Sequence, residues 1–137
     1  MARQAKLSTL EKKAWTACSK YVRTLYCLKT TKTPDTGRCF TCGAFLPIQD
    51  LDCGHFIKST NKDIKFHLDN LRPQCTRCNR FLGGNEGEYA IRLINEIGKE
   101  RVDYLFSRKG LVKARGRQDF LDLEQEFKNM LKELLEQ

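Results

Sequence analysis

The sequence contains no long hydrophobic run, because no apolar stretch approaches the roughly 18–20 residues that a helix needs to span a bilayer. The first residues, 1–8, also lack the apolar core of a secretory signal peptide. These absences predict a protein of the reducing cytoplasm that has no membrane partner. In that compartment paired cysteines act more often as metal ligands than as disulfides, so the seven cysteines of this chain are candidate ligands.

Internal repeats and low-complexity segments are absent as well. A length of 137 residues with 40% apolar content predicts a single domain, 1–137, with a modest core. Within it we expect a basic N-terminal helix at 1–33, a metal-bound core at 39–85 and C-terminal helices at 86–137. A loop-rich centre of this kind would be stabilised by a bound metal.

Positive charge is in excess but unevenly distributed. The net charge of +8 divides into +7 for residues 1–33, +5 for residues 34–117 and −4 for residues 118–137. A basic front and middle favour a polyanionic partner such as DNA, whereas the acidic end argues against nucleic acid there. Charge alone leaves open the alternative of a solvated basic surface.

The periodicity of apolar residues predicts a mixed α+β fold. Apolar side chains recur at helical spacing in four stretches, at residues 8–30, 85–97, 99–109 and 118–136. Short β-like runs at 49–57 and 64–68 predict a hairpin, and a short helix is expected at 76–82.

The last predicted helix has a coiled-coil rhythm. Its apolar residues are spaced alternately by three and four, at Phe120, Leu123, Phe127, Met130 and Leu134. This seam could join two chains into a homodimer through the terminal helices. Packing against the N-terminal helix of the same chain is the alternative.

Four cysteines have the spacing of a zinc site. They form two Cys-x-x-Cys pairs separated by 32 residues, Cys39 with Cys42 and Cys75 with Cys78. Zinc takes four tetrahedral ligands, and a two-residue spacer lets both sulfurs of a pair reach one ion. The pattern predicts a structural zinc rather than unrelated reduced thiols. Cys53 is left over, either as a substitute ligand or as a buried thiol.

Three further residues suit the chemistry of phosphodiester hydrolysis. His55 could act as the general base that activates water, and the amide oxygen of Asn79 could hold a divalent cation such as magnesium. Asn70 could orient the histidine or tie the hairpin loop through its backbone. The alternatives are a structural histidine for His55 and an ordinary turn residue for Asn70.

These residues together resemble the HNH, or ββα-metal, endonucleases. More narrowly, residues 39–105 are similar to the NinG/Rap family of lambdoid phage recombination nucleases. The resemblance rests on Gly54-His55-Phe56, Phe66 with Asn70, Gln74-Cys75, Cys78-Asn79-Arg80, and Gly84-Asn85 before Tyr89. It implies a zinc-bound ββα-metal core flanked by an N-terminal helix and C-terminal helices. It also implies metal-dependent cleavage of branched DNA, such as Holliday junctions and D-loops, in the cytoplasm of a bacterial host.

The resemblance assigns His55 as the general base, Asn79 as a ligand of a catalytic Mg²⁺ or Mn²⁺, and Asn70 as the middle asparagine of the motif. One position departs from the wider superfamily, in which a metal-binding acid or histidine often directly precedes the base. Here that position is Gly54. Asp52, three residues before the base, is the first candidate to replace it, and Asp50, Asp69 and Glu86 are the alternatives.

Basic residues near the hairpin and the second cysteine pair are the predicted DNA contacts. They are Lys58, Lys62, Lys65, Arg72, Arg77 and Arg80. Such residues bind phosphates without reading base sequence, and no recognition-helix signature is present, so selectivity for DNA structure is expected. A non-catalytic zinc module that binds nucleic acid, and an HNH enzyme that nicks or cuts at specific sites, are the alternative functions.

Overall fold

The computed structural model describes residues 4–137, so residues 1–3 of the predicted basic N-terminal segment lie outside the described residues. The fold is mixed α+β, as predicted, with four α-helices and two small sheets among the described residues. These residues form two compact units. One contains the chain up to Tyr21 together with Ala114–Gln137, and the other contains Val22–Lys113. No described helix is both long and apolar enough to cross a membrane.

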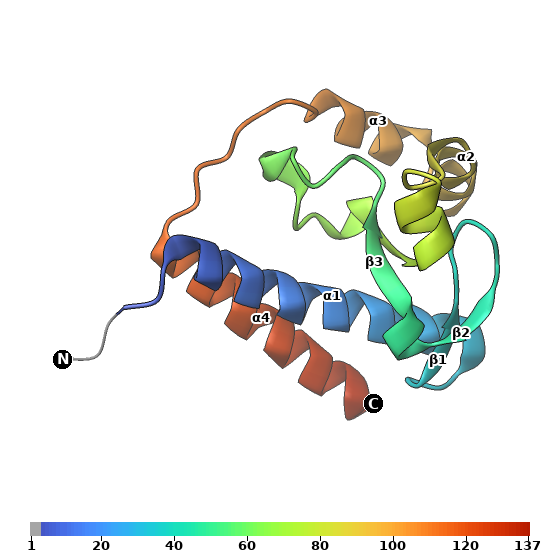
Figure 1. The fold of residues 1–137 in the computed structure, drawn as a ribbon, viewed down its shortest axis with the longest axis horizontal. Coiled ribbons are helices and arrows are strands. Elements are labelled where there is room, and N and C mark those ends of the chain that lie inside the picture. Colours follow the sequence, from blue (N-terminus) through green and yellow to red (C-terminus); the bar gives the residue numbers. More distant parts are fainter. Residues whose placement is uncertain (1–3) are drawn as a thin grey trace. The chain divides into compact units, whose positions relative to one another are not determined.

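The first unit consists of the first half of helix α1 (Leu7–Thr31) and helix α4 (Arg117–Leu135). Within this unit the two helices run side by side in the same direction (Figure 1), and Arg117 at the start of α4 donates to the Ala5 carbonyl at 2.6 Å. Phe120 and Phe127 of α4 are buried, and the Phe127 ring lies 6.1 Å from that of Tyr21. The apolar seam of α4 therefore packs within the chain, while the predicted homodimer stays a prediction.

The second unit contains two antiparallel sheets of two strands each. Strand β1 (Thr36–Arg38) pairs with β2 (Phe45–Pro47), and β3 (Leu51–His55) pairs with β4 (Leu71–Cys75). The predicted second hairpin arm at 64–68 is wrong. Ile64 and Phe66 are buried, but they anchor a loop with two 3₁₀ turns, at Lys62–Ile64 and Leu68–Asn70.

The strand that replaces this arm contains Pro73, which normally argues against a strand interior. It is tolerated because the sheet has only two strands, so each strand keeps one edge free of β-ladder hydrogen bonds. Strand β4 is followed by a short π-helix, η4 (Arg77–Phe81), where a short helix was predicted. The order strand, strand, helix is thus present at residues 51–81.

Helices α2 (Glu86–Ile97) and α3 (Lys99–Ser107) complete the second unit and meet at Gly98, whose φ of 90° suits glycine. Their inner faces form a core with the end of β3 and the following loop. Its buried members are Phe56, Ile57, Ile64, Tyr89, Leu93, Val102 and Leu105. This core holds the hairpin loop against the helices and so positions the residues around His55.

Candidate metal and catalytic centre

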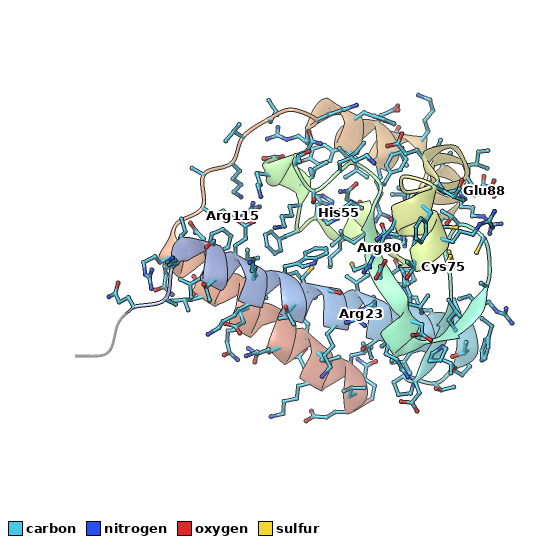
Figure 2. All side chains as sticks on the ribbon, in the orientation of Figure 1. Arg23, His55, Cys75, Arg80, Glu88 and Arg115 are labelled. Carbon is cyan, nitrogen blue, oxygen red and sulfur yellow. The ribbon has the colours of Figure 1, made fainter. Side chains whose placement is uncertain are left out.

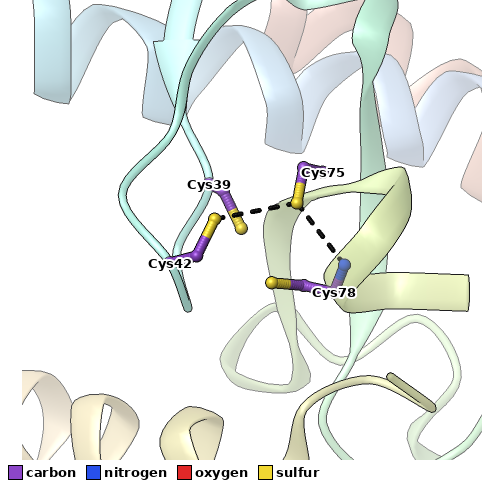
Figure 3. A group of neighbouring side chains, drawn as sticks. All are labelled: Cys39, Cys42, Cys75 and Cys78. Atoms are coloured by element: carbon purple, nitrogen blue, oxygen red, sulfur yellow. Dashed lines mark hydrogen bonds between the residues drawn. The ribbon is translucent and has the colours of Figure 1, made fainter. Parts of the chain in front are cut away.

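The four cysteines of the two Cys-x-x-Cys pairs converge on one point (Figure 3). Cys39 and Cys42 lie on the connection between β1 and β2, whereas Cys75 ends β4 and Cys78 lies in η4. Their sulfurs all lie within 4.8 Å of one another, and Cys42 Sγ is 3.7 Å from Cys75 Sγ. A tetrahedral ion with Zn–S bonds of about 2.3 Å holds its sulfurs about 3.8 Å apart. The cluster therefore has the composition and spacing that can hold a zinc ion, as predicted.

Local backbone and side-chain donors favour the thiolate of Cys39, whereas burial raises the pKa of Cys42 to about 12 and also raises that of Cys75. Gly43, at a φ of 79°, turns the chain so that Cys39 N bonds the Ala44 carbonyl, and the Cys78 amide donates to Cys75 Sγ at 3.4 Å. Burial opposes ionisation of the Cys39 thiol, but hydrogen bonds from the Thr41 hydroxyl and nearby amides lower its pKa to about 6. A thiol with a lowered pKa binds a metal readily.

Cys53 is not part of this cluster. It is buried on β3, with 8% of its surface exposed, and pairs across the sheet with Pro73. Of the two interpretations left open by the sequence, the buried thiol is the one that the structure supports.

His55 ends β3, and its ring reaches the loop after the strand. Its Nε2 lies 3.1 Å from the Lys65 carbonyl oxygen. Because a carbonyl can only accept, Nε2 carries the proton of the neutral ring and Nδ1 is the basic nitrogen. Burial lowers the pKa of His55 to about 4, and the charge of Lys65 acts in the same direction. The imidazole is therefore neutral at pH 7, the form that a general base requires.

Asn70 is completely buried and ties the loop after β3 to the start of β4. Its Oδ1 accepts from the Ile57 amide at 2.7 Å, and its Nδ2 donates to the Ile57 carbonyl at 2.9 Å. Its own carbonyl accepts from the Phe56 amide at 2.9 Å. These contacts fix the backbone directly after His55, in agreement with the predicted role of tying the hairpin loop.

Asp52 and Asn79 are brought together by the packing of η4 against β3. Asn79 Nδ2 donates to Asp52 Oδ2 at 3.0 Å, and Arg80 forms a fork to both oxygens of Asp52 at 3.1 Å. Figure 2 shows Arg80 in the second unit, which also contains His55 and Cys75. In this arrangement the amide nitrogen of Asn79, and not its oxygen, faces the Asp52 carboxylate. A carboxylate and an amide oxygen are both ligand types that hard divalent cations accept.

A glycine at position 54, where the resemblance led us to look for a metal ligand, has a physical reason. A Cβ atom at this position would lie 1.9 Å from Gln74 Oε1. The Gln74 side chain fills the space next to Gly54 and donates from Nε2 to Thr41 Oγ1 at 3.1 Å and to the Gly84 carbonyl at 2.8 Å. An acidic residue could not occupy position 54 without displacing this glutamine.

The predicted DNA contacts differ in where they lie. Lys58, Lys62, Arg77 and Arg80 are exposed and Lys65 is half-buried. Arg72 is only 2% exposed. Its guanidinium donates to the Leu68 and Leu71 carbonyls and pairs with Glu96 at 3.1 Å, so Arg72 is not on the surface. We therefore do not retain it among the proposed phosphate contacts.

Two residues that shape this centre were not predicted from the sequence. Gln74 occupies the position next to Gly54, and the Tyr89 hydroxyl donates to the Gly54 carbonyl at 2.9 Å. The signal available for both was their place in the motifs that carry the resemblance, Gln74-Cys75 and Gly84-Asn85 before Tyr89. That signal assigned neither residue a role.

Comparison with known proteins places the chain in a family. The sequence model of the family described as Bacteriophage Lambda NinG protein matches residues 2–137. The chain belongs to the NinG family. Among curated relatives, Protein ninG of Escherichia phage 933W is 36% identical over 70 residues, which cover 50% of this chain and 34% of that protein. Protein ninG of Escherichia phage lambda is 34% identical and that of Salmonella phage P22 33%, with the same coverage.

The aligned stretch thus covers about a third of the length of these NinG relatives. No solved structure matches the chain. The family membership rests on the sequence model over nearly the whole chain, and the arrangement of the centre rests on the fold described above.

Proposed function

We propose that this NinG-family chain is a metal-dependent DNA endonuclease of the HNH type that cleaves branched recombination intermediates such as Holliday junctions and D-loops. The contact that carries the proposal is the hydrogen bond between Asp52 and Asn79. Asp52 lies on β3, and Asn79 lies on η4, the helix that follows the β3–β4 hairpin. The contact thus brings together an acid and an amide that are far apart in the sequence. His55 ends the same strand.

The proposed mechanism gives each residue one task. His55, neutral because burial holds its pKa near 4, accepts a proton from the attacking water through Nδ1. The Lys65 carbonyl holds the ring by accepting from Nε2. Asn70 fixes the backbone beside the base through Ile57.

Asp52 and the oxygen of Asn79 would hold the catalytic Mg²⁺ or Mn²⁺ once the Asn79 amide turns its oxygen, in place of Nδ2, toward the cation. A bound divalent cation supplies positive charge to the scissile phosphate and the leaving oxygen. Arg80 occupies both oxygens of Asp52 in this structure. The Arg80 side chain is 66% exposed, so it can turn from the carboxylate to a DNA phosphate, and the bound cation would then neutralise Asp52, whose side chain is 22% exposed.

DNA as the partner is supported by the position of the cations. Lys58, Arg77 and Arg80 are exposed on the loop after β3 and on η4, close in sequence to the proposed catalytic residues. Contacts of this type make affinity strongly dependent on salt and indifferent to base sequence. A homodimer through the terminal helices, which would cut a two-fold junction at two sites, stays a prediction that sedimentation at micromolar protein can test.

The test is cleavage of a four-way junction by the zinc-loaded protein in Mg²⁺ or Mn²⁺. We expect His55→Ala to reduce the cleavage rate at least about a hundredfold, the usual contribution of a general base. The control is His67→Ala, because His67 is the other histidine of the chain and its Nδ1 only accepts from the Asp69 amide. Cleavage by His55→Ala at the wild-type rate would contradict the assignment.

A second comparison separates the alternative functions. Linear, flapped and four-way substrates of identical sequence are offered to the wild-type protein. Faster cleavage of the four-way substrate supports the proposal, whereas equal rates would indicate a nicking or site-specific enzyme. Binding without cleavage of any substrate would indicate a non-catalytic zinc module.

A further inference from the structure

Two adjacent apolar side chains protrude at the end of η4. Phe81 is 80% exposed and Leu82 is 45% exposed, directly after Arg80. Neither residue belongs to the core cluster around Tyr89 or to the one around the buried cysteines. A phenylalanine exposed to this extent beside a proposed active site is more informative than a scattered surface leucine.

The backbone that presents Phe81 is held in place from both sides. The Leu82 amide donates to the Arg77 carbonyl at 2.8 Å, and the Gly84 amide donates to the Cys78 carbonyl at 2.9 Å. Gly83, Gly84 and Asn85 all have positive φ, which forms a sharp turn directly after Leu82. Because Cys78 belongs to the cysteine cluster, the protruding pair is anchored on the metal-binding part of the fold.

The surroundings of Phe81 are cationic. Arg77 and Arg80 precede it on η4, and Lys58 reaches the turn after it by donating to the Gly83 carbonyl at 3.0 Å. Asn79, the proposed metal ligand, is two residues before Phe81. A surface that places an aromatic ring among cations matches a nucleic acid, in which phosphates and bases alternate at close range. Arg80 pairs with Asp52 and Lys58 with Glu86 in this structure, and both cationic side chains are exposed enough to turn to a phosphate.

We infer that Phe81, supported by Leu82, is a wedge that inserts between bases at the branch point of DNA. The inference deepens the proposed function and rests on it only in taking DNA as the partner of this face. Inserting an apolar side chain unstacks a base step, which costs free energy in a continuous duplex. At a junction or next to an unpaired base, that stacking is already weakened, so the cost is smaller. Phe81 would thereby select branched DNA without reading its sequence.

The experiment measures binding without added catalytic metal, so that it does not depend on cleavage. A four-way junction and a linear duplex of the same sequence each contain 2-aminopurine, at the branch point or the equivalent position. The full-length, zinc-loaded protein is titrated into each of the two DNAs. We expect the wild-type protein to raise 2-aminopurine fluorescence in the junction, because an unstacked base is less quenched.

Phe81→Ala should abolish most of this rise and reduce the preference for junction over duplex about tenfold, as expected for loss of one stacked ring. Phe81→Trp should restore both. The matched control is Phe45→Ala, because Phe45 is also an exposed phenylalanine (55%) with an arginine, Arg38, over its ring. It lies on β2, away from the η4 tip in sequence, and its removal should change neither readout.

Two results would overturn the wedge. One is an unchanged junction preference in Phe81→Ala. The other is an equal loss in Phe45→Ala, which would indicate a general effect of surface apolarity. Failure of the proposed function looks different: a protein that binds and unstacks the junction but does not cleave it in Mg²⁺ or Mn²⁺ contradicts the enzyme and leaves the wedge standing.

Discussion

Helix α4 and the first half of α1 bury ordinary apolar side chains against each other, such as Leu10, Phe120 and Phe127. The unit formed by Val22–Lys113 also has an apolar core, but its centre contains buried polar groups. Asn70, Arg72 and Gln74 are each 2% exposed or less, and three of the four clustered cysteines are buried. Apolar packing stabilises a fold in proportion to the area buried, whereas buried polar groups stabilise it only when each is satisfied.

This difference suggests why one unit would need a metal and the other would not. The second unit has short strands of three to five residues and several loops, so its secondary structure alone provides few cooperative hydrogen bonds. A four-thiolate site would connect the β1–β2 connection to β4 and η4. Among its described residues, the first unit contains no cluster of side chains that could hold a metal ion. The following predictions test this contrast, from the largest expected effect to the smallest.

Loss of the cluster should open the second unit. We expect Cys75→Ser to abolish zinc binding and to remove amide-exchange protection from β3 and β4, because a structural zinc contributes about 10 kcal/mol or more to folding. Protection in α4 should fall much less. Hydrogen exchange with mass spectrometry, together with measured zinc content, checks both expectations. The control is Cys53→Ser, a buried thiol outside the cluster, which should retain one zinc per chain.

Removal of an apolar side chain should affect the first unit without affecting the metal. We expect Phe127→Ala to lower the free energy of unfolding by about 4 kcal/mol, because it deletes a buried ring that contacts Tyr21. Chemical denaturation and zinc titration measure the two quantities separately. A loss of zinc affinity in this variant would contradict the expectation that Phe127 contributes to stability without affecting the metal site.

Removal of a buried polar side chain should affect the second unit even with zinc bound. In Asn70→Ala, the Ile57 amide and carbonyl both lose their partner in a buried site. We expect the free energy of unfolding to fall by about 3 kcal/mol in saturating zinc. Asn61→Ala serves as the control, since Asn61 is only half-buried. Equal stability of the two variants would contradict the importance of the buried hydrogen bonds.

The smallest changes in the free energy of unfolding are expected when two glycines, Gly54 and Gly87, are replaced by alanine. Gly54→Ala would drive a methyl group into Gln74, and we expect a loss of about 2 kcal/mol. Gly87→Ala meets nothing within 4 Å in α2, so we expect a gain of about 0.5 kcal/mol. If the double variant Gly54→Ala with Gln74→Ala is no less stable than Gln74→Ala alone, the clash is the cause. If Gly54→Ala lowers the free energy of unfolding by the same amount in the Gln74→Ala background, the clash with Gln74 is not the cause.

Much of the local structure was predictable because it depends on near neighbours in the sequence. Helical spacing predicted α1 at 8–30, and the structure has it at Leu7–Thr31. The two-residue spacer within each cysteine pair predicted the cluster. Strand β4 was missed because Pro73 and Gln74 are poor strand residues by local rules, and only the pairing with β3 makes the strand.

Arg72 illustrates the limit of charge as a signal. An arginine in a basic stretch is normally on the surface, and the sequence offered no reason to treat this one differently. Its burial follows from contacts with residues distant in the chain: its guanidinium pairs with Glu96 and lies over the ring of Tyr26 at 4.8 Å. Such partners become visible only when the chain is folded.

The sequence by itself determined which residues could do chemistry here: four paired cysteines, His55, Asn70 and Asn79, with enough positive charge to attract a polyanion. Only the tertiary structure decided how they meet. It brought Asp52 to Asn79, explained why position 54 is a glycine, and left Phe81 exposed at the end of η4. The physical reason is that spacing and composition act over a few residues, whereas burial and hydrogen bonding depend on groups that folding brings together from distant parts of the chain.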